Sequence, residues 1–274
     1  MKRRGIKSFT LTAALAVVAL VVLIPFFWMI TTSFMKSGES FAYPPVFWPK
    51  RFTLEQYTIL FKRLHFLRDF LNSFAVASLM TICSVFINSL AGFAFAKYTF
   101  KGRKFIFTSF LATMVIPAQV GMLPVFLILR QLGMLNTYWG LILPGAVSAF
   151  SIFFFRQYMS TIPTDLIDSA RIDGCGDFRI YWQIMLPLAR PALVTLGIFT
   201  FLGTWNDFMW PLIVLNRDTM YTLPVALANL MGEHAPDTEL MMAGSVVTVI
   251  PIMILFLALQ KSYMSGLIAG SLKE

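Results

Sequence analysis

Residues 8–35 read SFTLTAALAVVALVVLIPFFWMITTSFM, and this stretch decides what kind of fold the chain can adopt. Its 28 residues lie between Lys7 and Lys36 and carry no charge. A helix of about 20 apolar residues crosses the hydrocarbon core of a bilayer, so the stretch is long enough to span. It is about twice as long as a signal-peptide core, and no A-x-A cleavage site follows it. We therefore expect a retained membrane helix rather than a signal peptide.

Five more charge-poor intervals of 21 to 27 residues follow along the chain. Only Asp207 interrupts one of them, and none shows the period-two alternation of a membrane strand. The sequence thus predicts an all-α membrane protein with one transmembrane domain, residues 1–274, and six transmembrane helices. Their approximate ranges are 9–34, 71–96, 105–129, 138–158, 192–214 and 240–260.

The composition excludes other classes of protein. Apolar residues make up 58% of the 274 residues and charged residues 13%, against about a quarter in soluble domains. A soluble chain of this length could not bury that much apolar surface. The formal net charge is +9, but the charges lie between the apolar blocks. This pattern indicates membrane topology rather than binding to nucleic acid.

The distribution of basic residues predicts the orientation. Six spans put both termini on one side of the membrane. With that side inside, the inner segments hold 14 of the 22 Lys and Arg residues, four of them in the short loop at 97–104. Short connections carry most of the positive-inside bias, so we expect both termini in the cytoplasm. Residues 215–239 then form an external loop, because their charge-free part is too short to span.

The cytoplasmic segment between Arg156 and Arg190 has helix signals of its own. Asp165 and Asp168 suit the start of a short helix, and Gly174 suits its end. Asp177 can then cap a second helix over 178–185. From the residues alone, the first helix either docks another protein or lies on the membrane face, and both interpretations stay open.

This segment resembles the EAA loop of ABC-transporter permease subunits. The matching residues are Asp168-Ser169-Ala170, then Gly174, then Ile184-Met185-Leu186-Pro187. Asp replaces the family's Glu, and Ser replaces its first Ala. Two further stretches, LNTYWGLILP at 135–144 and TWNDFMWP at 204–211, look like segments of maltose-type carbohydrate permeases. The resemblance covers nearly the whole chain.

The resemblance implies a maltose-type importer permease fold, placed in the inner (cell) membrane of a bacterium or archaeon. The partners would be a second permease subunit, two ATPase subunits, an extracytoplasmic sugar-binding protein and membrane lipid, with no nucleic acid. The chain would have no catalytic residues, metal site or cofactor. ATP and magnesium would bind the ATPase, and the sequence contains no Walker A phosphate loop.

The resemblance also implies roles for particular residues. The loop at 160–189 would be a cytoplasmic coupling loop, and the 215–239 loop would contact the binding protein. The residues expected to couple to the ATPase are Asp168, Ser169, Ala170, Arg171, Asp173, Gly174, Leu186 and Pro187. The C-terminal residues expected at the ATPase interface are Gly266, Gly270 and Lys273.

Asp207 is the single acid inside a predicted span. An ionised carboxylate cannot face lipid cheaply, so we expect it to face the interior of the bundle. It either fixes the packing of neighbouring helices or lines the solute pathway, and both roles stay open. The residues that would share this role are Thr204, Trp205, Asn206, Asp207 and Trp210.

Two other classes of protein remain as rivals. An ion-coupled secondary transporter would show more intramembrane charges than this one acid. A membrane enzyme would need clustered acids or histidines, whereas His65 and His234 are isolated. We expect a subunit of a sugar importer. The sequence does not identify the sugar, and the alternative cargoes are a polyol, a glycerol phosphate or another solute.

Overall fold

The computed structural model describes residues 2–44, 46–62, 65–233 and 237–271. Every regular element in these ranges is a helix, so the predicted all-α class is confirmed. The longer elements and the short turns are, in chain order, α1 (Lys2–Thr32), η1 (Glu39–Phe41), α2 (Glu55–Lys62), α3 (Phe66–Lys97), α4 (Arg103–Thr113), α5 (Ala118–Gln131), α6 (Tyr138–Gly145), α7 (Ala149–Ser160), α8 (Asp165–Ile172), α9 (Asp177–Ile180), η2 (Tyr181–Met185), α10 (Leu186–Leu188), α11 (Arg190–Trp205), α12 (Met209–Val214), η3 (Asp218–Met220), α13 (Leu223–Glu233) and α14 (Thr238–Ser271).

Three helices in these ranges are long and apolar enough to cross a membrane without a break: α1, α3 and α14. Three more candidates are bent pairs, at 103° between α4 and α5, 48° between α6 and α7, and 81° between α9–α10 and α11. Counting each pair once gives six, the number that the sequence predicts. The exact ranges of the crossings stay a prediction.

A proline lies at or near each of these breaks. Pro117 is the N-cap of α5, Pro144 lies near the end of α6, and Pro191 lies in the first turn of α11. Each proline lacks the backbone amide that an unbroken helix would use in an i→i−4 hydrogen bond. The predicted span at 192–214 contains a further interruption at residues 206–208, where α11 ends and α12 has not begun.

The chain divides into two compact units, of which the first comprises residues 1–67 and 226–251. Its loop after α1 is held by acids near the start of α14. The Glu239 carboxylate accepts a hydrogen bond from the Ser40 amide at 2.7 Å, and the Ser37 hydroxyl donates to Asp237 at 2.5 Å. Ser33 and Tyr57 share a hydroxyl hydrogen bond of 2.8 Å. These contacts order the segment between α1 and α2.

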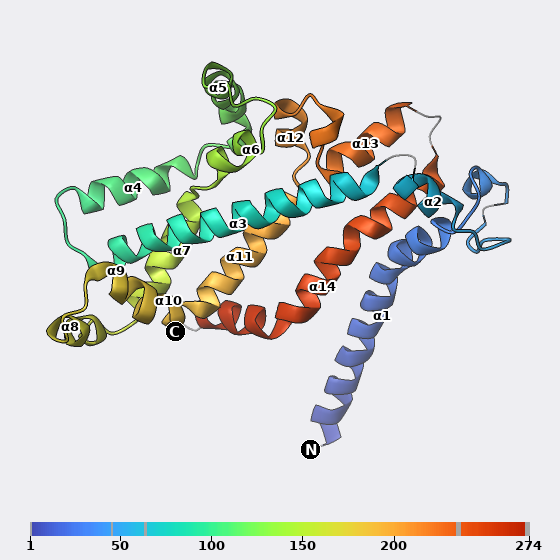
Figure 1. Cartoon of the computed structure of the whole chain (residues 1–274). Helices are drawn as coiled ribbons and strands as arrows, with labels where there is room; N and C mark the ends of the chain where they lie inside the picture. The colour runs from blue at the N-terminus through green and yellow to red at the C-terminus, as the bar shows by residue number, and fades with distance from the viewer. Residues whose placement is uncertain (1, 45, 63–64, 234–236, 272–274) are drawn as a thin grey trace. The chain divides into compact units, whose positions relative to one another are not determined.

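The second unit comprises residues 68–225 and 252–274. In it α11 lies alongside α3 (Figure 1), with aromatic contacts between Phe70 and Trp205 at 5.5 Å and between Phe74 and Phe201 at 6.2 Å. Gly92 allows α3 to approach α7 closely, because a Cβ there would lie 2.4 Å from the Cβ of Phe155. The core of this unit therefore depends on tight contacts between helices.

Twelve large apolar side chains along α1, between Leu11 and Ile30, are 43% to 65% exposed, whereas Trp28 and Met29 are half-buried. Exposed apolar surface this extensive marks contact with lipid or with another protein. This is the environment that the sequence predicts for the first span.

Candidate functional site

Helix α8 has one buried face and one exposed face. Ile167 and Ala170 are buried in the core of the second unit, whereas Asp168 and Ser169 are exposed. Asp165 and Asp168 lie in the first turn, where acids favour the positive end of the helix dipole. Of the residues predicted to couple to an ATPase, Ala170 thus packs inside this chain, and its neighbours are the ones free to contact a partner.

Gly174 ends α8, as the sequence predicts. Its φ of +80° is a left-handed conformation that glycine adopts without strain. The Gly174 amide donates to the Arg171 carbonyl at 3.0 Å, and the Cys175 amide donates to the Ala170 carbonyl at 2.9 Å. This pair of bonds is the Schellman pattern, which satisfies carbonyls at a helix C-terminus.

The segment after α8 is anchored to α3. Tyr181 is fully buried, shares a hydrogen bond of 2.8 Å with Ser89, and packs on Phe93 with ring centroids 5.7 Å apart. Burial raises the pKa of the Tyr181 phenol, although the bond to Ser89 opposes the rise. Leu186 is half-buried and Pro187 is exposed in α10. The predicted coupling loop is therefore an ordered surface fixed to a long helix.

Although the sequence predicts that Asp177 caps the second helix, Asp177 does not occupy the cap position. Gly176 occupies the N-cap position, and Asp177 is the first residue of α9. Its carboxylate instead pairs with the Arg171 guanidinium at 3.3 Å, and that guanidinium lies 5.4 Å from the centroid of the Tyr98 ring. The Tyr98 hydroxyl and then Arg171 hold the pKa of Asp177 below its ordinary value. The Lys97 ammonium adds a hydrogen bond to the Ile162 carbonyl.

The loop around α8 and α9 also exposes large apolar side chains that the sequence did not predict to be exposed. Ile172 is 87% exposed, Phe178 63% and Trp182 55%. All three lie within or beside the EAA-like stretch, so their apolar character was visible, but their exposure depends on how the loop folds. Together with the exposed Asp173 and Gly174, they give this loop exposed apolar surface suited to protein contact.

The second candidate site is a cavity of about 310 Å³ near the break between α11 and α12. It brings together Thr204, Asp207 and Trp210 of the predicted pathway set, and adds Ser73 and Thr222. The rest of its lining is mostly apolar and comes from α3, α5 and α6. The cavity thus combines one carboxyl group, hydroxyl groups and an indole within a largely apolar wall.

Asp207 also has a structural contact. Its carboxylate accepts a hydrogen bond of 3.3 Å from the amide of Trp210, in the first turn of α12. The Trp210 indole donates to the Gly140 carbonyl at 3.2 Å. Phe208 holds the N-cap position of α12, and the Asp207 carboxylate, one residue earlier, satisfies a backbone amide that has no partner within the helix.

Trp205 and Asn206 do not line this cavity. Trp205 is fully buried against Phe70 and Phe201, and the Asn206 side chain donates to the Leu202 carbonyl at 2.9 Å. Both residues therefore serve to pack or end α11.

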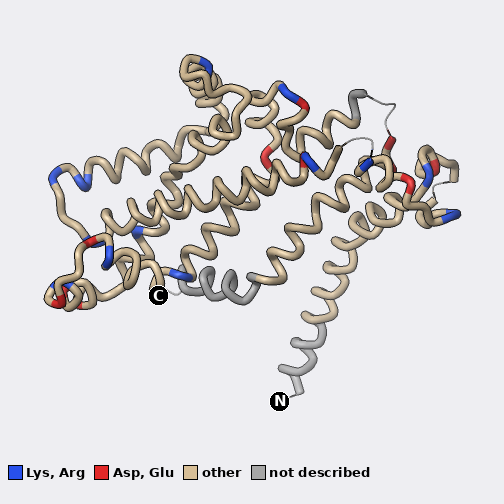
Figure 2. The backbone as a smooth tube through the Cα atoms, in the orientation of Figure 1, with Lys and Arg blue, Asp and Glu red and all other residues tan. Residues whose placement is uncertain are grey.

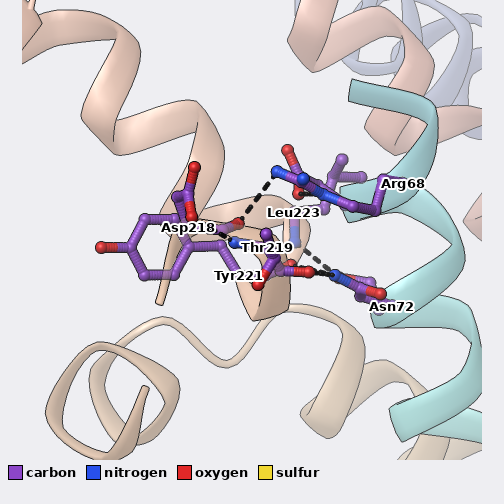
Figure 3. Close-up of polar contacts among 8 residues, drawn as sticks. Arg68, Asn72, Asp218, Thr219, Tyr221 and Leu223 are labelled. Atoms are coloured by element: carbon purple, nitrogen blue, oxygen red, sulfur yellow. Dashed lines mark hydrogen bonds and ion pairs between the residues drawn. The ribbon is translucent and has the colours of Figure 1, made fainter. Parts of the chain in front are cut away.

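The start of the predicted external loop is bound to α3 (Figure 3). Arg68 donates to the Asp218 carbonyl at 3.1 Å, and Asn72 donates to the carbonyls of Thr219 and Tyr221 at 3.1 and 3.0 Å. The Leu223 amide donates to the Ser73 hydroxyl at 2.6 Å. These contacts fix residues 218–223 beside the cavity that Ser73 and Thr222 line.

The structure gives little information on the C-terminal residues predicted to lie at the ATPase interface. Gly266 and Gly270 lie within α14, whereas Lys273 lies outside the described residues, as does His234. Within the described part of the chain, no three His, Cys, Asp or Glu side chains group closely enough to hold a metal ion.

Comparison with known proteins gives consistent matches. Residues 87–265 match the family described as "Binding-protein-dependent transport system inner membrane component". The arabinooligosaccharides transport system permease protein AraQ of Halalkalibacterium halodurans is 38% identical, over 100% of both chains.

Two solved structures are also similar. One is a bacterial ABC transporter that imports the acidic polysaccharide alginate, with a TM-score of 0.82 and 26% identity over 95% of this chain and 98% of that one. A second structure, of a bacterial alginate ABC transporter in complex with an alginate pentasaccharide-bound periplasmic protein, matches with a TM-score of 0.65 and 15% identity over 93% and 94%. The second likeness concerns the fold alone.

Proposed function

The chain belongs to the family of binding-protein-dependent transport system inner membrane components and is a permease subunit of an ABC importer, and from this we propose that its cargo is an oligosaccharide. The observation that carries the proposal is the full-length identity to an arabinooligosaccharide permease. The similar alginate importer also takes a carbohydrate polymer, which supports the same class of cargo.

For the cavity, we propose that Asp207 mainly holds the break between α11 and α12. The support is its bond to the Trp210 amide, together with the indole bond to Gly140. A sugar hydroxyl could still reach the carboxylate, because Asp207 lines the cavity with Ser73 and Thr204. The packing role and the solute role therefore predict different results for Asn and Leu at this position.

For the coupling loop, we propose that α8 and the residues that follow it dock on an ATPase subunit, to which ATP and magnesium bind. The support is an exposed surface that includes Asp168, Ile172 and Phe178 and rests on a well-packed core. A cysteine at Asp168, which is exposed, should cross-link to the ATPase subunit, whereas one at Ala170, which is buried, should not.

The full assembly that we propose contains this chain, a second permease subunit, two ATPase subunits and an extracytoplasmic sugar-binding protein. Both termini face the cytoplasm, and residues 215–239 face outward. A membrane-impermeant thiol reagent applied to intact cells should label a Lys50→Cys variant quickly and leave a Lys101→Cys variant unlabelled. The opposite pattern would reverse the orientation.

The cargo is tested with the reconstituted complex and its binding protein. ATP hydrolysis is measured against arabino-oligosaccharides, galacto-oligosaccharides, lactose, a polyol and glycerol 3-phosphate. We expect an oligosaccharide to stimulate hydrolysis most strongly. Stimulation by the polyol or by glycerol 3-phosphate alone would contradict the proposed cargo and leave the family unaffected.

A further inference from the structure

An open groove of about 870 Å³ lies where α3 turns into α4. Its nine lining residues come from the turn, the first residues of α4 and one residue of α7, and include Phe100, Arg103, Lys104, Phe105, Phe107 and Arg156. Three of the nine residues are basic. Neither candidate site includes this groove.

The positive charge in the groove has no acid nearby in the sequence. No Asp or Glu occurs between Asp69 and Asp165, so the groove residues lie in an acid-free stretch of 95 residues. Basic residues gather at the turn between α3 and α4 (Figure 2). The salt bridges found among the described residues involve Arg68 and Arg171, and neither residue belongs to the groove. The groove lining itself contains three basic residues and no acidic one, so it is complementary to an anion.

Arg156 is held in place at the groove rather than free in solvent. Its guanidinium carbon lies 4.2 Å from the centroid of the Phe107 ring, and its Nε donates to the Phe95 carbonyl at 3.4 Å. Phe95 and Phe107 are themselves buried, with ring centroids 5.4 Å apart. The contacts with Phe95 and Phe107 therefore fix the Arg156 guanidinium, and the exposed Lys104 supplies a second basic group.

Apolar side chains accompany these charges at the same level of α4. Phe105 is 78% exposed and Phe100 is 42% exposed. From Phe105 onward the chain enters the 25 uncharged residues of the predicted third span. A site that combines basic side chains with exposed aromatic rings suits a ligand that has an anionic head and an apolar tail.

We propose that this groove binds the phosphate headgroup of an anionic phospholipid, with Arg103, Lys104 and Arg156 facing the phosphate and Phe105 lying against the acyl chains. Bilayer lipid supplies both parts of this ligand, whereas a free phosphate has no partner for Phe105. The proposal rests on the membrane placement of α4, and it is independent of the identity of the sugar.

The test uses the purified full chain in detergent and native mass spectrometry. Dioleoyl phosphatidylglycerol and dioleoyl phosphatidylcholine are added in equal amounts, and the ratio of the retained lipids is measured. The groove variant is Arg103→Gln with Lys104→Gln, and the matched control is Lys50→Gln with Arg51→Gln in the loop after α1. Size-exclusion chromatography confirms that each variant is folded.

We expect phosphatidylglycerol to be retained preferentially by the unmodified chain and by the control. The groove variant should lose about fivefold of that preference for each charge removed, since a basic residue near an anionic surface contributes on the order of 1 kcal/mol. Equal loss in the control, or no loss in the groove variant, would overturn the site.

Two further outcomes would assign the groove to a different ligand and so overturn the proposal. Inorganic phosphate that displaces the lipid at equal concentration would make the groove a site for soluble phosphate. Loss of ATPase co-purification in the groove variant, with lipid retention unchanged, would make it a protein contact. The lipid measurement needs neither cargo nor ATP, so its failure would leave the proposed import function standing.

Discussion

Replacing Gly174 by alanine tests whether its left-handed conformation stabilises the end of α8. Gly174 has a φ of +80°, and a Cβ built there meets no atom within 4 Å in this chain. The cost of alanine is therefore conformational, about 1–2 kcal/mol for a left-handed residue. That cost corresponds to a factor of about 5 to 30 in the population of the native turn.

Gly176 provides the matched control. It is exposed, its φ is −72°, and a Cβ there also meets nothing within 4 Å. Gly176→Ala puts alanine at the N-cap of α9 without backbone strain, so any cost should fall on α9 and not on the amides that close α8. Gly174→Asn should be milder than Gly174→Ala, because Asn tolerates the left-handed conformation better.

The assay is hydrogen exchange at the amides of Gly174 and Cys175, which close the end of α8. Their protection should fall about 5- to 30-fold in Gly174→Ala and stay unchanged in Gly176→Ala. Equal loss in the two variants, or none in Gly174→Ala, would refute the reasoning.

Gly174→Glu extends the same test to the partner. In this chain Gly174 is exposed and an added Cβ meets nothing within 4 Å, so glutamate should cost the isolated subunit little more than alanine does. Against a docked ATPase it would place a charge in a close contact, which is costly unless it is paired. We expect membrane insertion to persist while ATPase co-purification and uptake are lost. Normal uptake would refute docking at Gly174.

Three other predictions follow from single contacts. Asp207→Asn keeps an acceptor for the Trp210 amide and should give near-normal complex yield and uptake. Asp207→Leu removes that acceptor, should lose about 1 kcal/mol of stability at the start of α12, and should assemble poorly. Normal assembly of both variants with altered sugar preference would favour the solute role. Gly92→Ala should destabilise the subunit by about 1–3 kcal/mol in thermal unfolding, because the added Cβ would clash with α7. Gly203→Ala should not destabilise it, because a Cβ there meets open space. Equal melting temperatures for the two variants would contradict the close packing. Because the Tyr98 hydroxyl and Arg171 lower the pKa of Asp177, the ionised carboxylate should stabilise the fold fully above the ordinary Asp pKa of about 4, and this contribution should be lost as pH falls below that value. Hydrogen exchange at α8 should show this acid dependence, and Asp177→Asn should abolish the dependence.

Local signals made the helical class and the end of α8 predictable. Charge-free length alone indicates a membrane helix, and a glycine after an amphipathic stretch indicates a helix stop. Both depend on residues close in sequence, so no tertiary information was needed. The same holds for α8 itself, whose first turn carries Asp165 and Asp168.

The bends were not predictable from the prolines. Pro25 and Pro251 lie inside α1 and α14 without breaking them, whereas Pro117 and Pro144 lie at or next to breaks. Proline only removes one amide donor, and the neighbouring helices decide whether the helix continues. Those neighbours come from distant parts of the chain.

The cavity and the contact between Tyr98 and Arg171 were also not predictable, because each joins residues that are far apart in the sequence. Ser73 and Thr222 line one cavity although 149 positions separate them, and Tyr98 lies over Arg171 across 73 positions. The sequence singled out Asp207 because it is the one acid in a span, but its bond to Trp210 requires the break after α11. Trp205 and Asn206 were grouped with it by proximity in sequence, and the structure separates them from the cavity.

The most direct test of the central claim is uptake of a labelled arabino-oligosaccharide into proteoliposomes that contain the complete complex. The account predicts uptake that requires ATP on the side of α8, the sugar-binding protein on the opposite side, and this subunit. Gly174→Glu should abolish it. Uptake that persists without ATP and follows an ion gradient would contradict the account and indicate a secondary transporter.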